Sequence, residues 1–200
     1  MNESTPSPIV LYHGARAWDG PPEVRPGRKK RTEHGPGIYL TTAYVTAQKY
    51  AKGGGRVKRI FLDPKLSWIE DARVPLADAV AFVEAHPRLR KRREIVADLR
   101  ANAGRMGAGD GTIGAYVLNN LMVNYDALVG DAAPALARFF ADHGIDAAIN
   151  QTFSADGAEE DWVVLFNPMK ILRHEDVDSR RFDGPRSLPL LRKPRSRIGG

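Results

Sequence analysis

The pattern of hydrophobic and polar positions predicts strands near both ends of the chain. A nearly continuous apolar run at the N-terminal end is typical of a buried strand. A third run alternates between apolar and polar residues and is ended by Pro64, as expected of a strand. Three strands are expected before the middle of the chain and two after it: residues 8–13, 38–41, 56–63, 145–150 and 161–166, with residues 152–160 as the final turn.

The middle of the chain is helical in its periodicity. Apolar residues recur there at helical spacing, and prolines stand near the starts of the segments. Four helices are predicted, at residues 75–86, 87–103, 112–125 and 134–143, the last ended by Gly144. A further short helix is expected directly after the second strand, with Thr42 as its N-cap and Gly53 at its C-terminal end.

Strands at both ends with helices between them predict an α+β fold rather than repeated βαβ units. Two hundred residues are typical of one domain with tails. We expect a disordered N-terminus over residues 1–7, one domain over residues 8–173 with residues 75–143 as a helical insertion, and a basic tail over residues 174–200. Beyond Ile171 we expect linker and tail.

Composition narrows the class of protein. The chain is 42% hydrophobic and has no apolar run near the ~20 residues that span a bilayer. Its first eight residues lack the hydrophobic core of a signal peptide, so a soluble, cytoplasmic protein is expected. The absence of cysteine excludes disulfides and thiolate metal sites.

The charge is concentrated at the C-terminal end. Residues 180–200 hold seven lysines and arginines and one acid, which gives +6, equal to the formal net charge of the whole chain. Such a tail is either a solvated, disordered terminus or a contact for nucleic acid or an acidic partner.

Two short motifs carry the candidate chemistry. Tyr12-His13-Gly14 ends the first strand, where the histidine can both donate and accept a hydrogen bond. Gly37-Ile38-Tyr39-Leu40-Thr41 forms the second strand, and Ala47-Gln48-Lys49-Tyr50-Ala51 lies in the helix that follows. A strand-to-helix corner of this kind places Tyr39 at the mouth of a cleft, where its ring can face a planar ligand.

These motifs, in this order and followed by the late strand VVLFNPMKI over residues 163–171, resemble the ADP-ribosyltransferase family. The resemblance is to its histidine–tyrosine–glutamate branch, which includes the poly-ADP-ribose polymerases and bacterial and phage toxins. It implies a split, mostly antiparallel pair of β-sheets with an NAD cleft between them. The implied activity is transfer of ADP-ribose from NAD to a macromolecular acceptor, protein or nucleic acid, with release of nicotinamide.

The resemblance also implies roles for residues and partners. His13 would bond the adenosine ribose, and the backbone of Gly14 would meet the nicotinamide carboxamide. Tyr39 and Tyr50 would flank the nicotinamide ring, with Thr41 as a polar support. NAD is then a substrate, and the chemistry requires no metal. A bacterial or phage enzyme of this kind is expected to be a toxin or effector, in the cytoplasm or delivered into a target cell, with an antitoxin or immunity protein as a possible partner.

The third motif of the family supplies a carboxylate that stabilises the ribose cation. Several residues of this chain are candidates for that position. Glu160 is favoured, because alternation places it on the strand face of Trp162 and Phe166. Asp161 is nearly equal and Gln151 is a more distant alternative. Counting back from Phe166 strictly by the family's spacing, the position of the carboxylate falls on Trp162. An indole side chain cannot supply the negative charge.

Two rival functions follow. One is a non-catalytic module with the same fold, binding nucleic acid or acting as a scaffold, which the count to Trp162 favours. The other is transfer of an RNA 2′-phosphate to NAD, which would need further arginine and histidine motifs that the sequence lacks. The other histidines show no metal-ligand spacing.

Overall fold

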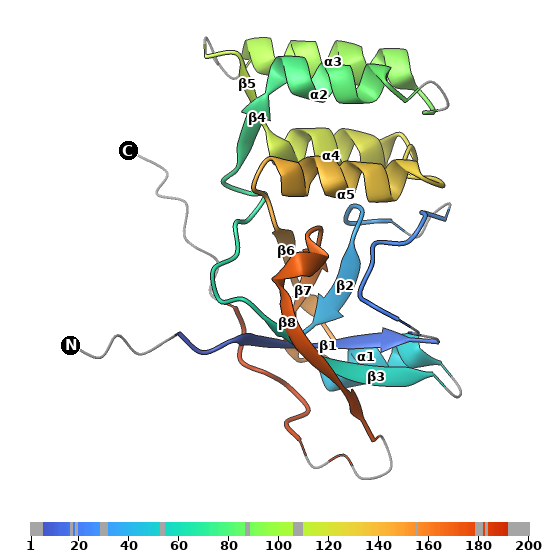
Figure 1. The fold of residues 1–200 in the computed structure, drawn as a ribbon, viewed down its shortest axis with the longest axis vertical. Coiled ribbons are helices and arrows are strands. Elements are labelled where there is room, and N and C mark those ends of the chain that lie inside the picture. Colours follow the sequence, from blue (N-terminus) through green and yellow to red (C-terminus); the bar gives the residue numbers. More distant parts are fainter. Residues whose placement is uncertain are drawn as a thin grey trace, which may run out of the picture.

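The computed structural model describes residues 6–16, 18, 20–28, 32–52, 55–86, 89–105, 110–154, 156–178, 182 and 184–191. Its elements follow one another in the order drawn in Figure 1. They are β1 (Ile9–Ala15), β2 (Ile38–Thr41), α1 (Tyr44–Ala51), β3 (Arg56–Leu62), β4 (Arg73–Pro75), α2 (Leu76–Glu84), α3 (Arg92–Arg105), β5 (Thr112–Gly114), α4 (Ala115–Asn124), α5 (Ala132–Asp142), β6 (Ala147–Phe153), β7 (Glu159–Leu165), the 3₁₀ turn η1 (Pro168–Lys170) and β8 (Ile171–Val177).

The main sheet has the strand order β6-β7-β2-β1-β3-β8 among the described residues, and its neighbouring strands are antiparallel. Its two halves meet where β1 and β2 are paired only at Tyr12 and Thr41. Figure 1 shows β1 and β3 crossing the direction of β2, β6 and β7 at a wide angle. The predicted mixed α+β class with a mostly antiparallel sheet is confirmed.

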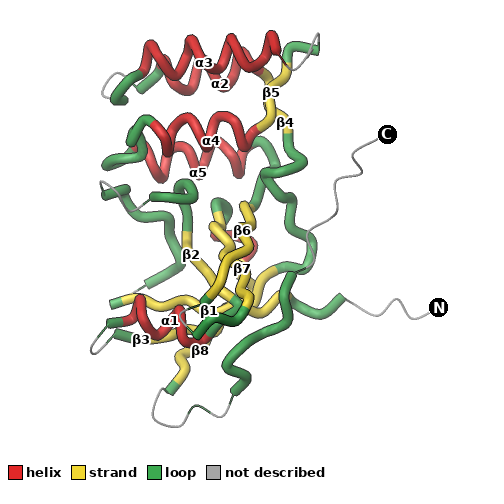
Figure 2. The backbone as a smooth tube through the Cα atoms, turned by 180° about the vertical axis from the view of Figure 1, so that it is seen from behind, coloured by secondary structure: helices red, strands yellow, loops and turns green. Residues whose placement is uncertain are grey.

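The helices from the middle of the chain form layers against the upper half of this sheet. Figures 1 and 2 show α4 and α5 next to the strands and α2 and α3 stacked beyond them, with β4 and β5 alongside. No helix of the described residues is long and apolar enough to cross a membrane.

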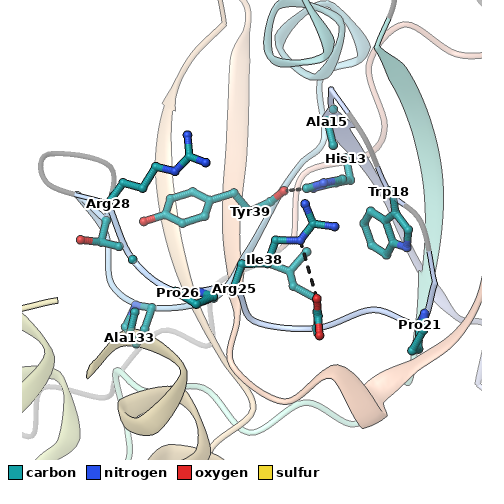
Figure 3. Close-up of a pocket in the computed structure, with 16 residues that line it drawn as sticks. His13, Ala15, Trp18, Pro21, Arg25, Pro26, Arg28, Ile38, Tyr39 and Ala133 are labelled. Atoms are coloured by element: carbon teal, nitrogen blue, oxygen red, sulfur yellow. Dashed lines mark hydrogen bonds and ion pairs between the residues drawn. The ribbon is translucent and has the colours of Figure 1, made fainter. Parts of the chain in front are cut away.

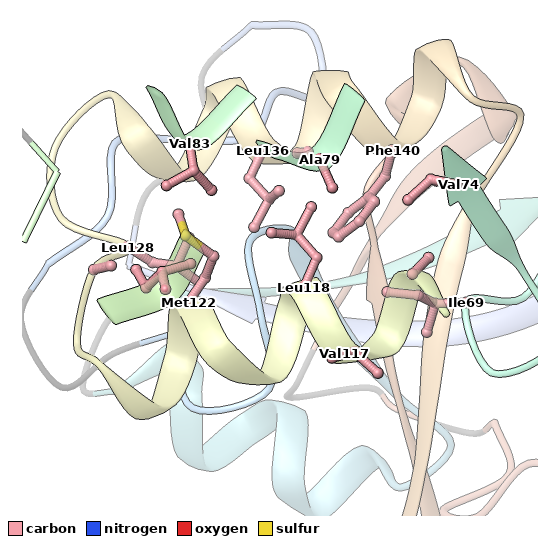
Figure 4. Close-up of a cluster of buried hydrophobic side chains, with 14 of the residues drawn as sticks. Ile69, Val74, Ala79, Val83, Val117, Leu118, Met122, Leu128, Leu136 and Phe140 are labelled. Carbon is pink, nitrogen blue, oxygen red and sulfur yellow. The ribbon is translucent and has the colours of Figure 1, made fainter. Parts of the chain in front are cut away.

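The largest hydrophobic core lies between these helices and the sheet (Figure 4). Leu118 and Met122 project from α4 toward Leu136 and Phe140 of α5, and each of the four is fully buried. Phe140 also packs against Phe166 after β7, with ring centroids 4.9 Å apart. The helical segment therefore shares its core with the strands that carry the candidate site.

A smaller core holds α1 against β1. A side chain at Gly14 would place its Cβ 1.7 Å from the Ala47 carbonyl oxygen, so only glycine permits this close approach. Tyr12 and Tyr44 pack edge to face beside it, with ring centroids 5.6 Å apart. The glycine that ends the first motif thus sets the distance between the strand and the helix.

Several predicted boundaries were wrong. Residues 171–177 form strand β8 on the edge of the sheet, where linker was expected. Residues 112–114 form strand β5, where a helix was expected to start, and α3 begins at Arg92 instead of at residue 87. The strands β6 and β7 extend into the expected turn, to Phe153 and from Glu159.

The predicted N-cap was also wrong. Helix α1 begins at Tyr44, and the preceding Ala43 supplies no side-chain cap. The Thr42 hydroxyl instead accepts the backbone N–H of Asp161, at 2.9 Å, and so joins the corner to β7. Gly53, expected at the end of this helix, lies outside the described residues.

Part of the segment predicted to be a basic tail packs against the domain. Phe182 stacks on Tyr44 with ring centroids 3.9 Å apart, and the Tyr12 hydroxyl donates to the Pro185 carbonyl at 2.7 Å. The N–H of Leu188 donates to the Thr42 carbonyl at 2.8 Å. These described residues therefore cover the strand-to-helix corner, while residues 1–5 and 192–200 lie outside the described part of the chain.

We expect Phe140→Ala to lower the free energy of unfolding by about 3–5 kcal/mol, because it removes a buried ring and leaves a cavity. Phe153→Ala is the matched control, since that ring is 68% exposed, and should change stability by less than about 0.5 kcal/mol. Urea denaturation measures both. Equal losses in the two variants would contradict the assignment of the core.

Candidate active site

His13 lies where the two halves of the sheet separate. Its Nδ1–H donates to the Tyr39 carbonyl oxygen, at 2.7 Å, just beyond the single strand pair (Figure 3). Because a carbonyl only accepts, the neutral imidazole carries its proton on Nδ1 and presents Nε2 as an acceptor. Trp18 packs edge to face against the imidazole, with centroids 4.7 Å apart. The first motif thus bridges β1 and β2.

A cavity of about 610 Å³ opens beside this bridge. The ends of β1 and β2, together with the segment between them, form its wall, and Arg25 and Arg28 supply positive charge. Glu23 lies 3.8 Å from Arg25. The described residues lining the cavity are His13, Gly14, Ala15, Trp18, Pro21, Glu23, Arg25, Pro26, Gly27, Arg28, Thr32, Pro36, Gly37, Ile38, Tyr39 and Ala133.

Burial, together with nearby positive charges, favours the neutral form of His13. Burial is the main cause that lowers the pKa of His13 below its ordinary value of 6.5, and the positive charges of Arg25 and Lys58 lower it further. The hydrogen bond to the Tyr39 carbonyl acts in the opposite direction. His13 can therefore act as a hydrogen-bonding group without adding a charge at neutral pH.

Two hydrogen bonds hold the hydroxyl of Tyr39. Its hydroxyl donates to the Gly35 carbonyl at 2.9 Å and accepts the N–H of His34 at 3.3 Å. Burial raises the pKa of Tyr39 to about 12, so the hydroxyl stays protonated. The ring is consequently fixed in orientation at the wall of the cavity.

Glu160 is the carboxylate that the structure brings to the second motif. The hydroxyls of Thr41 and Thr46 donate to its two oxygens, at 2.6 and 3.0 Å, and the residue is only 1% exposed. Alternation places Tyr39 and Thr41 on one face of β2, and the Thr41 bond shows that Glu160 lies on this same face. Glu160 lies outside the residues that line the 610 Å³ cavity.

Trp162 lies between His34 and Tyr50 of α1. Its ring contacts His34 with centroids 5.4 Å apart and Tyr50 with centroids 6.1 Å apart, both edge to face. Its buried Nε1–H has no hydrogen-bond partner in the described structure. Tyr50 is 53% exposed, and the negative charge of Glu160 contributes to raising its pKa, after burial and the charge of Glu33. Tyr39, Tyr50, Trp162 and Glu160 therefore form one neighbourhood.

The other acidic candidate has a different setting. An Asp161 carboxylate oxygen accepts the backbone N–H of Leu191 at 2.6 Å, and Asp161 is fully buried. Alternation along β7 directs it to the face opposite Glu160. Gln151 pairs directly with Asp161 and is exposed, so it shares that opposite face. The structure brings Glu160 to Thr41 and Thr46, on the strand face that Tyr39 shares, and does not bring Asp161 or Gln151 there.

Sequence reasoning missed three of these residues. Thr46 precedes Tyr50 by one helical turn, so helical spacing would have placed both on one face of α1. Trp18 and Arg25 lie in the long connection after β1, where neither periodicity nor a motif identifies a position. Among the described residues, no group of three or more histidine or acidic side chains could hold a metal ion.

The comparisons with protein-family models, curated proteins and solved structures found no match for this chain.

We expect the imidazole of His13 to titrate below pH 6.5, as followed by NMR of its ring protons. The unfolded chain binds this proton more readily, so the contribution to stability is fully present above pH 6.5 and is lost as the pH falls through the lower, folded pKa. His13→Gln should remove that part of the pH dependence. A titration midpoint at or above 6.5 would show that the imidazole is not held neutral.

Proposed function

We propose that this chain is an NAD-dependent ADP-ribosyltransferase with a split-sheet fold of that family. It transfers ADP-ribose from NAD to a protein or nucleic-acid acceptor, releases nicotinamide, and acts as a toxin or effector. The observation that carries the proposal is the shared neighbourhood of Tyr39, Tyr50 and Glu160 beside a cavity lined by His13 and Gly14. His13, Gly14, Tyr39 and Tyr50 match the motif positions that the resemblance assigns to NAD, and Glu160 is the favoured carboxylate for the third motif.

The cavity suits a dinucleotide in size and charge. Its volume of about 610 Å³ lies within the range of small-molecule sites. Arg25 and Arg28 provide the positive charge that a pyrophosphate requires. The hydrogen bond of Nδ1 to the Tyr39 carbonyl leaves Nε2 of His13 to accept from a ribose hydroxyl.

The chemistry needs one preorganised negative charge. The bond between ribose C1 and the nicotinamide nitrogen breaks, its electron pair leaves with nicotinamide, and positive charge develops on the ribose. A fixed carboxylate stabilises that charge more effectively than water, because it needs no reorganisation. Glu160 takes this role, and Thr41 and Thr46 are positioning residues that hold it. The acceptor then bonds to C1 and loses a proton.

A non-catalytic module is the second candidate, and one observation favours it. Glu160 is 1% exposed and both of its oxygens already accept threonine hydroxyls, while Trp162 stands at the strictly counted family position. In that case the cavity binds a nucleotide, or a nucleic acid, without cleaving it. The two candidates differ in whether NAD is consumed.

We expect the purified protein, incubated with NAD and cell extract as a source of acceptor, to release free nicotinamide. Glu160→Gln should lower the rate at least roughly 100-fold, as when one preorganised electrostatic group is removed from an active site. His13→Ala and Tyr39→Ala should also reduce release, through weaker binding of NAD.

Two variants serve as controls in the same assay. Glu159→Gln changes an exposed carboxylate next to Glu160 and should leave the rate near that of wild type. Asp161→Asn should lower thermal stability, through its bond to Leu191, more than it lowers the rate of the folded fraction. No release by the wild-type protein, with NAD binding intact, would establish the non-catalytic candidate instead.

A further inference from the structure

Asn119 is a buried polar residue that no step of the proposed reaction uses. It lies in helix α4 and is only 6% exposed. Its Nδ2–H donates to the His34 carbonyl at 3.3 Å, between residues 85 positions apart in the chain. Its Oδ1 has no hydrogen-bond partner within the described structure. A buried acceptor without a donor lowers stability, so stability alone does not explain an amide at this position.

The turn that Asn119 contacts is built around a glycine. The N–H of Gly35 donates to the Thr32 carbonyl at 3.1 Å, which closes the turn. Gly35 has a φ of +112°, a conformation that favours glycine. A Cβ on Gly35 would lie 2.3 Å from Oδ1 of Asn119, so the amide packs directly against this residue. Asn119 therefore contacts the turn at two consecutive residues, His34 and Gly35.

The same two residues hold the hydroxyl of Tyr39. This hydroxyl donates to the Gly35 carbonyl at 2.9 Å and accepts the N–H of His34 at 3.3 Å. The backbone of the turn thus meets Asn119 through one set of atoms and Tyr39 through another. Tyr39 lines the 610 Å³ cavity, whereas Asn119 is not among its described lining residues. The turn of residues 32–35 is therefore a short physical connection from α4 to the cavity wall.

In this contact, α4 is the rigid side. Leu118 and Met122, on either side of Asn119 in the sequence, are fully buried in the largest core. A helix packed in this way gives the Asn119 amide little freedom to move. The turn of residues 32–35 belongs instead to the long connection between β1 and β2, which contains no helix or strand among its described residues. Asn119 is therefore the fixed partner, and the turn is the part that it holds in place.

We propose that Asn119 is a positioning residue for Tyr39. By holding the turn against α4, the amide fixes the two backbone groups that orient the Tyr39 hydroxyl. The ring then keeps one direction at the cavity wall, as a site that binds a planar ligand requires. The binding of nicotinamide by Tyr39 rests on the proposed function, whereas the dependence of Tyr39 on Asn119 does not.

The first test follows the Tyr39 ring in the whole chain without NAD. Asn119→Leu removes the amide at nearly the same volume, and Asn119→Ala is a second variant that cannot clash with Gly35. NMR of ¹³C-labelled tyrosine rings reports the setting of each ring, and Tyr39→Phe identifies the Tyr39 signal. We expect both variants to shift and broaden this signal. Asn120→Ala, at the exposed neighbouring position of α4, is the matched control and should leave it unchanged.

The second test measures the affinity for NAD by calorimetry, without acceptor. Asn119→Leu should weaken binding about three- to tenfold, the size expected when one aromatic contact loses its orientation. In a Tyr39→Ala background the same change should have no further effect, because Asn119 acts through Tyr39. A residue that serves the fold alone would change the affinity equally in both backgrounds. Asn120→Ala should leave the affinity unchanged.

Thermal unfolding checks the fold of every variant. Both Asn119 variants should stay folded, because each removes the unpaired Oδ1 together with the donor. Unfolding of both would overturn the proposal and assign Asn119 to the fold instead. An unchanged Tyr39 signal, or equal losses of NAD affinity in the two backgrounds, would overturn it as well. If the wild-type protein does not bind NAD, the proposed function fails, and the Tyr39 signal alone decides the role of Asn119.

Discussion

The carboxylate of Glu160 is the constraint on which the central corner of this protein depends. An ionised carboxyl group removed from water is very costly unless hydrogen bonds replace its hydration. Here two threonine hydroxyls do so, one at the end of β2 and one within α1. One buried group therefore holds the corner between this strand and helix to the start of β7.

The sequence predicted the parts of this corner that depend on simple periodicity. The strands β1 and β2 follow from their apolar residues. Alternation along β7 is enough to place Glu160 and Asp161 on opposite faces of that strand. The choice between these acids required the contacts of Thr41 and Leu191, which lie far away in the chain. Helical spacing could have identified Thr46, but no sequence signal pointed to the cavity residues in the long connection after β1.

Two of the wrong predictions have identifiable physical causes. Strand β8 lies on the edge of the sheet and its side chains are mostly charged or exposed, so it lacks the buried face that a hydrophobic pattern records. Its position is set by pairing with β3 and by ion pairs such as Lys58 with Asp176, at 2.8 Å. Thr42 has a good side chain for capping, yet the N–H of Asp161 takes its hydroxyl, because tertiary contacts override local preference.

The bond between Tyr12 and Pro185 joins residues 173 positions apart. Strand β1 and the segment that follows β8 must therefore meet before the corner around Thr41 and Glu160 is covered. Loops of this length close late in folding, because the chain loses the entropy of loop closure before the stabilising long-range contacts form. During synthesis the strands β1 and β2 leave the ribosome before Pro185 and Leu188 do, so these contacts form later. The corner is thus covered only after residues 185–188 have been synthesised, and a chain interrupted before them would leave it uncovered.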